Sequence, residues 1–125
     1  METPQFSLAD VQAAVGAGQF VLHVERCDAM LARHIADPAA RRAFLQAAIA
    51  TLAATDFYRR VDDDNIKYDA YGKVLPVSVL SPFGLQEKKE WYIGVKTSKT
   101  GAVIVSFHRP VRRIVLANGA ILAMR

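Results

Sequence analysis

Residues 91–109, WYIGVKTSKTGAVIVSFHR, alternate between apolar and polar side chains in two runs with a turn-rich segment between them. Alternation at period two is typical of strands that bury one face, so it predicts a β-hairpin that turns within residues 97–101. The predicted apolar face carries Trp91, Ile93, Val95, Val103, Val105 and Phe107. The opposite face carries Tyr92, Gly94, Lys96, Ile104, Ser106 and His108. Any fold of this chain must therefore cover one side of the hairpin with a hydrophobic layer.

The second face of this hairpin has an unusual chemistry. Sheet faces that meet solvent favour Thr, Lys and Glu, whereas this one combines a phenol, an ammonium, a hydroxyl and an imidazole. Phenol and imidazole groups can both donate and accept protons. We therefore interpret Tyr92 and His108 as candidates for proton transfer, with a structural role for His108 as the alternative.

The composition is that of an ordinary soluble globular domain, with 125 residues, 52% hydrophobic and 22% charged. We expect one domain over residues 1–125. No apolar run reaches the ~18 residues of a membrane span, and residues 1–10 lack the features of a signal peptide. We therefore expect no membrane partner and a cytoplasmic location. Cys27 has no partner at metal-ligand spacing and is interpreted as a packing residue.

The formal net charge of +4 is distributed unevenly along the chain. The segment after Glu90 contains six basic residues and no acidic one. These are Lys96, Lys99, Arg109, Arg112, Arg113 and Arg125. Because this segment includes the polar face of the hairpin, that face would lie in a positive field suited to a polyanion such as RNA. A basic surface that serves only solubility is the alternative.

Helices are predicted in the first half of the chain. Ser7 and Asp10 have the spacing of a capping box before a helical repeat of apolar residues. Residues 20–24 form a short β-branched and aromatic run, and Asp28 is a candidate N-cap for a helix through residue 36. Asp37 and Pro38 begin the most regular helix, residues 38–52. Its apolar stripe, predicted to be core, consists of Phe44, Leu45, Ala48, Ile49 and Leu52.

Strands are predicted in the second half. Residues 65–71 and 73–80 are expected to form two strands separated by Gly72, with Pro76 placing the second at a sheet edge or bulge. Asn118 and Gly119 signal a turn between residues 114–117 and 120–124, so residues 110–125 would form an additional C-terminal hairpin. This order predicts an α+β fold, with N-terminal helices packed on one face of a C-terminal antiparallel sheet. The polar face of the central hairpin would be left open.

Asp62, Asp63 and Asp64 form an acidic run. Neighbouring carboxylates can bind Mg²⁺ or act as acid and base. Three consecutive residues cannot all face one site, however, and the polar, turn-rich neighbours favour a solvated loop. We therefore expect no metal site and no cofactor.

Five short segments, taken in order, resemble the MqsR toxins, which are small RelE-like endoribonucleases of bacterial toxin-antitoxin systems. The resemblance covers residues 6–109. The segments are FSLADVQAAVGAG from residue 6, DFYRR at 56–60, KYDAY at 67–71, WYIGV at 91–95 and VIVSFH at 103–108. Residues 82–89 and 110–125 are additional to the family pattern. The resemblance implies a RelE-like fold, metal-independent cleavage of single-stranded mRNA and a cognate antitoxin as partner.

The family pattern also implies a set of catalytic residues, because it surrounds the scissile phosphate with a Lys, a Gln, a Tyr and a second Lys. The first Lys corresponds here to Arg59, which keeps the charge and can hold a phosphate through two hydrogen bonds. The Gln corresponds to Tyr68, which departs from the pattern. The Tyr is preserved as Tyr92. The last Lys corresponds to His108, a residue type that titrates near neutral pH.

Cleavage of RNA by its own 2′-OH, which leaves a 2′,3′-cyclic phosphate, needs a base, a cation beside the phosphorane and an acid for the leaving oxygen. We assign Arg59 to the phosphate, and Tyr92 and His108 to proton transfer in either order. Residues expected to hold the RNA are Lys67, Lys96, Arg109, Arg112 and Arg113. Two alternatives stay open, namely a non-catalytic basic module that binds nucleic acid or protein, and a nuclease that depends on the ribosome.

Overall fold

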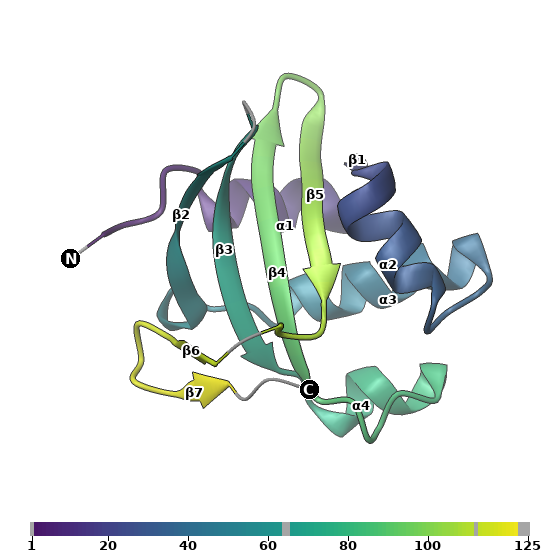
Figure 1. The fold of residues 1–125 in the computed structure, drawn as a ribbon. Helices are drawn as coiled ribbons and strands as arrows, with labels where there is room; N and C mark the ends of the chain where they lie inside the picture. The colour runs from purple at the N-terminus through teal and green to yellow at the C-terminus, as the bar shows by residue number, and fades with distance from the viewer. Residues whose placement is uncertain (1, 64–65, 112, 123–125) are drawn as a thin grey trace.

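Helices precede most of the strands along the chain in a mixed α+β fold (Figure 1). The computed structural model describes residues 2–63, 66–111 and 113–122. Its α-helices are α1 (Leu8–Gly16), α2 (Ala29–Ala32), α3 (Pro38–Ala50) and α4 (Val77–Leu80). Shorter helical segments are η1 (Val24–Asp28), η2 (Ala54–Asp56) and η3 (Ser81–Phe83). The strands are β1 (Phe20–Leu22), β2 (Phe57–Asp63), β3 (Ile66–Val74), β4 (Glu90–Ser98), β5 (Gly101–His108), β6 (Ile114–Val115) and β7 (Ile121–Leu122). Over the residues described, no helix is long and apolar enough to cross a membrane.

Five strands form one sheet in the order β1-β5-β4-β3-β2. Strands β2 to β5 pair antiparallel with one another, and the exception is β1, which pairs parallel with β5. The predicted α+β class and the hairpin of residues 91–109 are therefore confirmed. The parallel pair was not predicted, because β1 is only three residues long and its partner lies about 80 positions later, at residues 102–104.

The starts of α1 and α3 follow the capping signals in the sequence. The Ser7 hydroxyl accepts a hydrogen bond from the Asp10 N–H at 3.2 Å, and the Asp37 carboxylate accepts one from the Ala40 N–H at 2.9 Å. These bonds satisfy donors that the first helical turn leaves unpaired. Both starts were predictable because every group involved is local in sequence.

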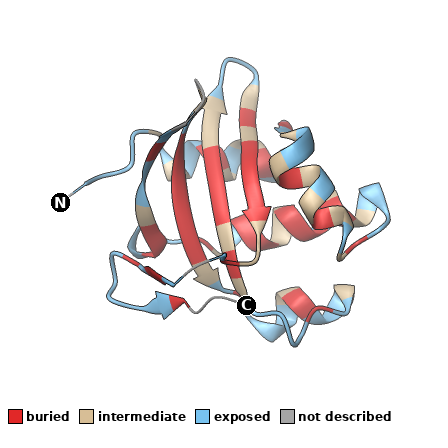
Figure 2. Ribbon diagram, in the orientation of Figure 1, coloured by how far each residue is buried: buried red, intermediate tan, exposed pale blue. Residues whose placement is uncertain are grey.

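α1 and α3 share a hydrophobic core with the sheet, and both lie on the same side of it in Figure 1. The Phe44 ring of α3 packs edge-on against Trp91 and Phe107, with centroid distances of 5.7 Å and 5.5 Å. Figure 2 shows buried positions along most of the central strands. The predicted apolar stripe is buried throughout, at Phe44, Leu45, Ala48 and Ile49 of α3 and at Leu52 just after it. The prediction of this core face is confirmed.

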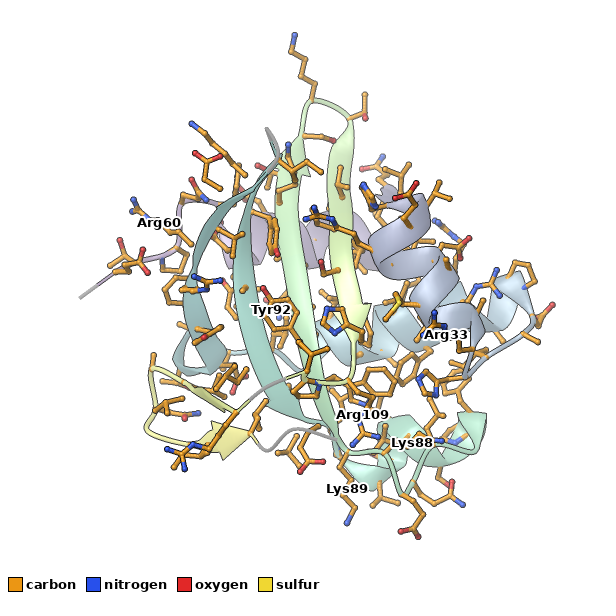
Figure 3. The ribbon with its side chains drawn as sticks, in the orientation of Figure 1. Arg33, Arg60, Lys88, Lys89, Tyr92 and Arg109 are labelled. Atoms are coloured by element: carbon orange, nitrogen blue, oxygen red, sulfur yellow. The ribbon has the colours of Figure 1, made fainter. Side chains whose placement is uncertain are left out.

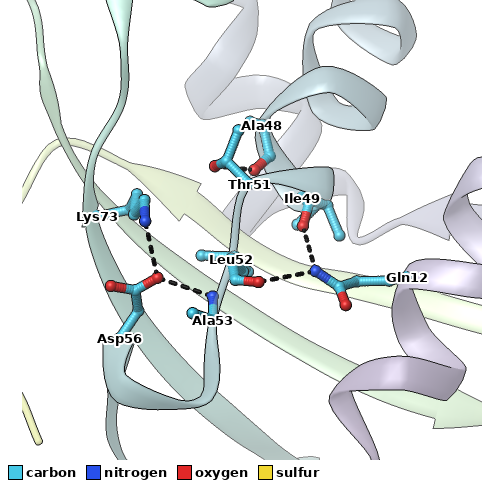
Figure 4. A network of polar contacts seen from close by, with 8 residues as sticks. All are labelled: Gln12, Ala48, Ile49, Thr51, Leu52, Ala53, Asp56 and Lys73. Atoms are coloured by element: carbon cyan, nitrogen blue, oxygen red, sulfur yellow. Dashed lines mark hydrogen bonds and ion pairs between the residues drawn. The ribbon is translucent and has the colours of Figure 1, made fainter.

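Polar contacts tie the end of α3 to α1 and to the sheet (Figure 4). The Gln12 side chain of α1 donates hydrogen bonds to the carbonyls of Ile49, at 3.0 Å, and Leu52, at 2.9 Å. Asp56, in η2, accepts a hydrogen bond from the Lys73 ammonium of β3 at 3.0 Å. Because Asp56 is buried, the Lys73 charge compensates its carboxylate and fixes the connection between α3 and β2.

A β-bulge interrupts the pairing of β4 with β5. Gly94 pairs with Ser106, whereas the next residue, Val95, pairs with Ile104. Val105 is therefore an extra residue on β5, opposite no residue of its own on β4.

Up to the bulge, the residues of β5 face the side opposite to the one predicted. After the bulge, they face the predicted side. Ile104 lies in the core shared with the helices, and Val103 and Val105 lie in a smaller cluster on the opposite face. The predicted faces of these three residues were wrong, because one extra residue breaks a period of two. Phe107 is buried in the core and His108 borders the opposite face, as predicted.

β3 continues through Gly72, and the strand predicted over residues 73–80 is wrong. Pairing with β4 runs without interruption over residues 69–74. Pro76 has extended backbone angles and precedes α4. Because proline has no N–H to donate to a sheet, the strand ends before it and a helical turn follows. Gly72 provides space instead of a break, since a Cβ there would lie 2.7 Å from side-chain carbons of both Leu116 and Leu122.

The acidic run lies at the end of an edge strand, where a solvated loop was predicted. β2 pairs with β3 on one side only, and Asp62 is opposite Lys67. Asp62 is exposed, Asp63 is the last residue of β2, and Asp64 lies outside the described residues. An edge strand has one side open to solvent, which accommodates charges that a central strand would not.

The helix predicted to begin at Asp28 begins earlier, at Val24, and ends at Ala32. Nδ1 of His23 accepts a hydrogen bond from the Arg26 N–H at 3.1 Å and so caps this segment. No capping role was predicted because histidine is not among the usual N-cap residues. Asp28 instead forms an ion pair with Arg41 of α3 at 2.9 Å.

β6 and β7 form the predicted hairpin around Asn118 and Gly119, over fewer residues than expected. Its Ile114, Leu116 and Leu122 form a small hydrophobic cluster that also contacts Tyr58 and Tyr92. The hairpin therefore covers part of the sheet face that was expected to be open.

Tyr71 of β3 is buried in the core, and its hydroxyl has no hydrogen-bond partner among the described residues. Burial, and then the charges of Asp69 and Asp56, raise the pKa of Tyr71 to about 12. The folded protein therefore holds this proton more tightly than the unfolded chain does.

We expect Tyr71→Phe to raise the free energy of unfolding by about 1 kcal/mol at neutral pH, because an unpaired buried hydroxyl costs about 1–3 kcal/mol. The raised pKa of Tyr71 also contributes to the free energy of unfolding. This contribution is complete below about pH 10, where an unfolded tyrosine is still neutral, and it is lost as the pH rises toward 12. The wild type should therefore lose more stability on alkalinisation than the variant does. Urea unfolding near neutral pH and near pH 11 measures both effects. If the variant is less stable than wild type at neutral pH, the expected gain in the free energy of unfolding is contradicted.

Candidate active site

Four polar side chains from three adjacent strands meet on the sheet face opposite α1 and α3. Tyr68 comes from β3, Tyr92 from β4, and Ser106 and His108 from β5. Tyr92 is in register with His108 across the β4/β5 pair. Figure 3 shows Tyr92 in front of the middle of the sheet. The structure thus brings together three of the four predicted catalytic residues.

Direct contacts join the three predicted residues. The hydroxyl oxygens of Tyr68 and Tyr92 are 3.2 Å apart and share a hydrogen bond. The rings of Tyr92 and His108 stack with centroids 5.0 Å apart and planes inclined by 17°. Tyr92 therefore contacts both other residues and is the centre of the group.

A backbone carbonyl fixes the orientation of the His108 ring. Nδ1 of His108 is 2.8 Å from the carbonyl oxygen of Arg109. Because a carbonyl only accepts hydrogen bonds, Nδ1 carries the proton and donates it, which leaves the lone pair of the neutral imidazole on Nε2. Nε2 is therefore the atom that can take a proton from a substrate.

The environment of Tyr92 favours its neutral form. Burial, and then the hydrogen bond and charge of Tyr68, raise the pKa of Tyr92, while the nearby Arg59 cation acts in the opposite direction. At neutral pH the Tyr92 phenol is protonated. It can donate a hydrogen bond or a proton, whereas it has little capacity to act as a base.

Gly94 makes room for the Tyr68 ring. A Cβ at Gly94 would lie 2.6 Å from Cε2 and 2.7 Å from Cδ2 of Tyr68. Contacts below 3 Å are not tolerated in folded proteins, so any side chain at this position must displace the ring. No pattern in the sequence indicated this requirement, because it depends on the pairing of β3 with β4.

We expect Gly94→Ala to move the Tyr68 ring, break its hydrogen bond to Tyr92 and lower the free energy of unfolding by about 1–3 kcal/mol, the usual cost of overpacking. Gly16→Ala is the matched control, because no atom lies within 4 Å of a Cβ at that helix end. This control should change stability by no more than about 1 kcal/mol. Urea unfolding measures both, and equal stability of the two variants would contradict the assigned role of Gly94.

The tyrosine pair and His108 border an open pocket of about 370 Å³ between η1, α2 and the segment that follows β5. Its walls are formed by Glu25, Arg26, Met30, Tyr68, Tyr92, Ser106, His108, Pro110, Val111 and Ile114. The contributions of η1 and α2 were not predicted. They depend on the parallel pairing of β1 with β5, which brings the segment after β1 beside the end of β5.

Arg59 lies on the pocket side of β2 but outside the pocket lining. It pairs with Ala70, which belongs to the same cluster as Tyr68. Its side chain is exposed, and the guanidinium carbon is 5.6 Å from the centre of the Tyr58 ring. The charge of Arg59 reaches Tyr92, as the effect on the pKa of Tyr92 indicates. Arg59 can therefore act on a bound group near Tyr92 from the rim of the site.

The predicted RNA-binding residues are scattered around this site. Lys96 lies on the same sheet face, whereas Lys67 precedes Tyr68 on β3 and so points to the other face. The Arg109 guanidinium is held 3.3 Å from the Glu90 carboxylate and 5.6 Å from the centre of the Trp91 ring. Arg113 is exposed, and Arg112 lies outside the described residues.

Further cations gather near Arg109 and were not predicted. Burial, and then the charges of Lys88, Arg109 and Arg33, lower the pKa of His34. Figure 3 shows Arg33, Lys88 and Arg109 on the same side of the molecule, below and beside Tyr92. The positive field inferred from the sequence is therefore reinforced by Arg33 after α2 and by Lys88 in the segment that leads into β4.

Within the described residues, no group of three or more His, Cys, Asp and Glu side chains is arranged to hold a metal ion. The groups that the described residues bring to the site are an imidazole with a fixed orientation, a hydrogen-bonded pair of phenols and a nearby guanidinium. No model of a known protein family matches this chain, and the curated proteins include no match to it either.

Proposed function

We propose that this protein is the toxin of a type II toxin-antitoxin pair, an endoribonuclease of the MqsR type that cleaves single-stranded mRNA in the cytoplasm without a metal. The observation that carries the proposal is the stack of His108 on Tyr92, with Nδ1 of His108 fixed and Tyr92 hydrogen bonded to Tyr68. The α+β fold supports a RelE-like arrangement, in which N-terminal helices cover the sheet face opposite the site.

These groups suit an attack by the RNA's own 2′-OH. Nε2 of His108 removes the 2′-OH proton, and the 2′ oxygen forms a bond to phosphorus. The bond from phosphorus to the 5′ oxygen then breaks, and that oxygen takes the Tyr92 proton. The products are a 2′,3′-cyclic phosphate and a 5′-OH. The Tyr68 hydroxyl stabilises the charge that develops on Tyr92 by donating a hydrogen bond to it.

The surrounding cations supply the electrostatic part of catalysis and binding. The charge of Arg59 acts on Tyr92, and the same cation would stabilise the phosphorane at a phosphoryl group bound beside Tyr92. Arg33 and Lys88 extend the positive field along one side of the molecule and would attract the RNA backbone. This distribution supports a nucleic-acid substrate over a small neutral one.

The test is incubation of the purified protein with a single-stranded RNA oligonucleotide in excess chelator. We expect fragments that end in a 2′,3′-cyclic phosphate, and no cleavage of a DNA oligonucleotide of the same sequence, because DNA lacks the 2′-OH. Expression of the protein alone should arrest growth, and coexpression of its cognate antitoxin should restore it.

Three outcomes would revise the proposal. A requirement for Mg²⁺ would contradict the metal-independent mechanism. Cleavage only in the presence of ribosomes would make the protein a ribosome-dependent nuclease. Tight RNA binding with no cleavage under any of these conditions would identify a non-catalytic binding module.

A further inference from the structure

The pocket beside Tyr92 and His108 has a chemistry that a phosphate group alone does not explain. Much of its wall is apolar and comes from Met30, Pro110, Val111 and Ile114. A phosphate and its sugar gain little from such walls, whereas the flat faces of an unpaired nucleobase do gain from them. A volume of about 370 Å³ is also ample for one base with part of its ribose. The part of an RNA chain that fits this pocket is therefore a base.

A hydroxyl in the same pocket has no partner within the described residues. Ser106 is 3% exposed and lines the pocket, and no hydrogen bond joins its hydroxyl to another residue of the described chain. The Ser106 hydroxyl is thus available to a bound molecule, and it can both donate and accept.

Glu25 in the pocket wall is unexpected in a site for a polyanion. Its carboxylate is exposed and has no ion pair within the described part of the chain. A carboxylate repels RNA phosphates, so it opposes binding unless it serves to select among bases. Carboxylates accept hydrogen bonds from exocyclic amino groups such as N4 of cytosine. Uracil has a carbonyl oxygen at that position, and a carboxylate repels it.

We propose that this pocket is a base-binding subsite, which takes one unpaired nucleobase next to the scissile phosphate and prefers a base with an exocyclic amino group to uracil. The inference rests on the proposed function for the identity of the substrate, but it concerns recognition and not the chemical step. Glu25 sets the preference. Ser106 contributes affinity for either kind of base, because its hydroxyl suits an amino or a carbonyl group.

The experiment compares binding of oligodeoxycytidylate and oligodeoxyuridylate of equal length, measured by fluorescence anisotropy. The two bases have the same size and differ at C4 and N3, and neither probe can be cleaved because both lack the 2′-OH. We expect the wild type to bind the cytosine probe about tenfold more tightly, the discrimination that one charge-assisted hydrogen bond supplies.

Three variants separate the contributions. Glu25→Gln should bind the two probes with nearly equal affinity, since an amide can face either base. Glu87→Gln makes the same change of charge at an exposed position outside the pocket and should keep the full preference. Ser106→Ala should weaken the binding of both probes and keep their ratio.

Equal binding of the two probes by wild type, an unchanged preference in Glu25→Gln, or no saturable binding of either probe would overturn the subsite. The base preference is measured with probes that cannot be cleaved, so this test is independent of the proposed nuclease activity. RNA cleavage without a base preference refutes the subsite alone. A base preference without RNA cleavage refutes the nuclease alone.

Discussion

His108→Gln should lower the rate of RNA cleavage by at least about 10²-fold, which corresponds to about 2.7 kcal/mol of transition-state stabilisation. Affinity for RNA should be nearly unchanged, because glutamine is polar and similar in reach but cannot exchange a proton. The structure makes this substitution informative, since Nδ1 of His108 is already committed to the Arg109 carbonyl and Nε2 alone is left for the substrate. Single-turnover cleavage and anisotropy with an uncleavable RNA analogue separate the two effects.

Matched variants distinguish proton transfer from charge and from general damage. His34→Gln removes an imidazole that stacks edge-on against Trp91 outside the pocket, and it should keep most of the rate. Arg59→Ala should weaken both binding and rate, because its cation serves the bound phosphate and the phosphorane alike. His108→Lys should recover part of the activity at higher pH, because lysine side chains lose their proton at much higher pH than histidine side chains do. Full activity in His108→Gln would refute the site and redirect attention to Asp62, Asp63 and Asp64.

Ile49→Asp should prevent soluble folding. Ile49 is fully buried in the core between α3 and the sheet, so an aspartate there would place an unpaired charge in an apolar environment. We expect a loss of about 4 kcal/mol or more, against a total stability of about 5–15 kcal/mol for a typical domain. Soluble yield and the cooperativity of thermal unfolding measure the effect.

Ala43→Asp is the control for this substitution. Ala43 lies in the middle of the same helix and is exposed, so the change in helix propensity and net charge is similar while no charge is buried. It should remain folded, with a loss below about 1 kcal/mol. Cooperative melting of Ile49→Asp at the wild-type temperature would contradict the packing of α3 in the core.

Features that depend on near neighbours could be predicted from the sequence. The N-caps at Ser7 and Asp37 and the turn at Asn118 and Gly119 each involve groups within a few residues, and all three are found. The buried stripe of α3 follows from its period alone. The predictions were wrong where one residue type can serve two structural roles. Gly72 was interpreted as a break, although its role is to let the β6–β7 hairpin approach β3.

The candidate site could be predicted only in part, for a related reason. Strand alternation placed Tyr92, Ser106 and His108 on one face, and their contacts follow from antiparallel pairing. Glu25 and Met30 belong to a helical segment more than 60 residues earlier, and only the parallel pairing of β1 with β5 brings them to the pocket. Arg59 was expected among the reacting groups and lies at their rim, because β2 is the edge strand.

The bulge at Val105 limits what the spacing of residues along β5 can indicate. Without Val105, Ile104 and Ser106 would be consecutive residues opposite Val95 and Gly94, so its deletion would restore regular pairing with β4. Phe107 would still face the core and His108 the pocket, because both would keep their partners on β4. Evolution can therefore exchange or remove the residue at position 105 without turning His108 away from the site. In a search for distant homologues, the alternation from Ser106 to His108 is a more durable marker than the number of residues from Gly101 to His108.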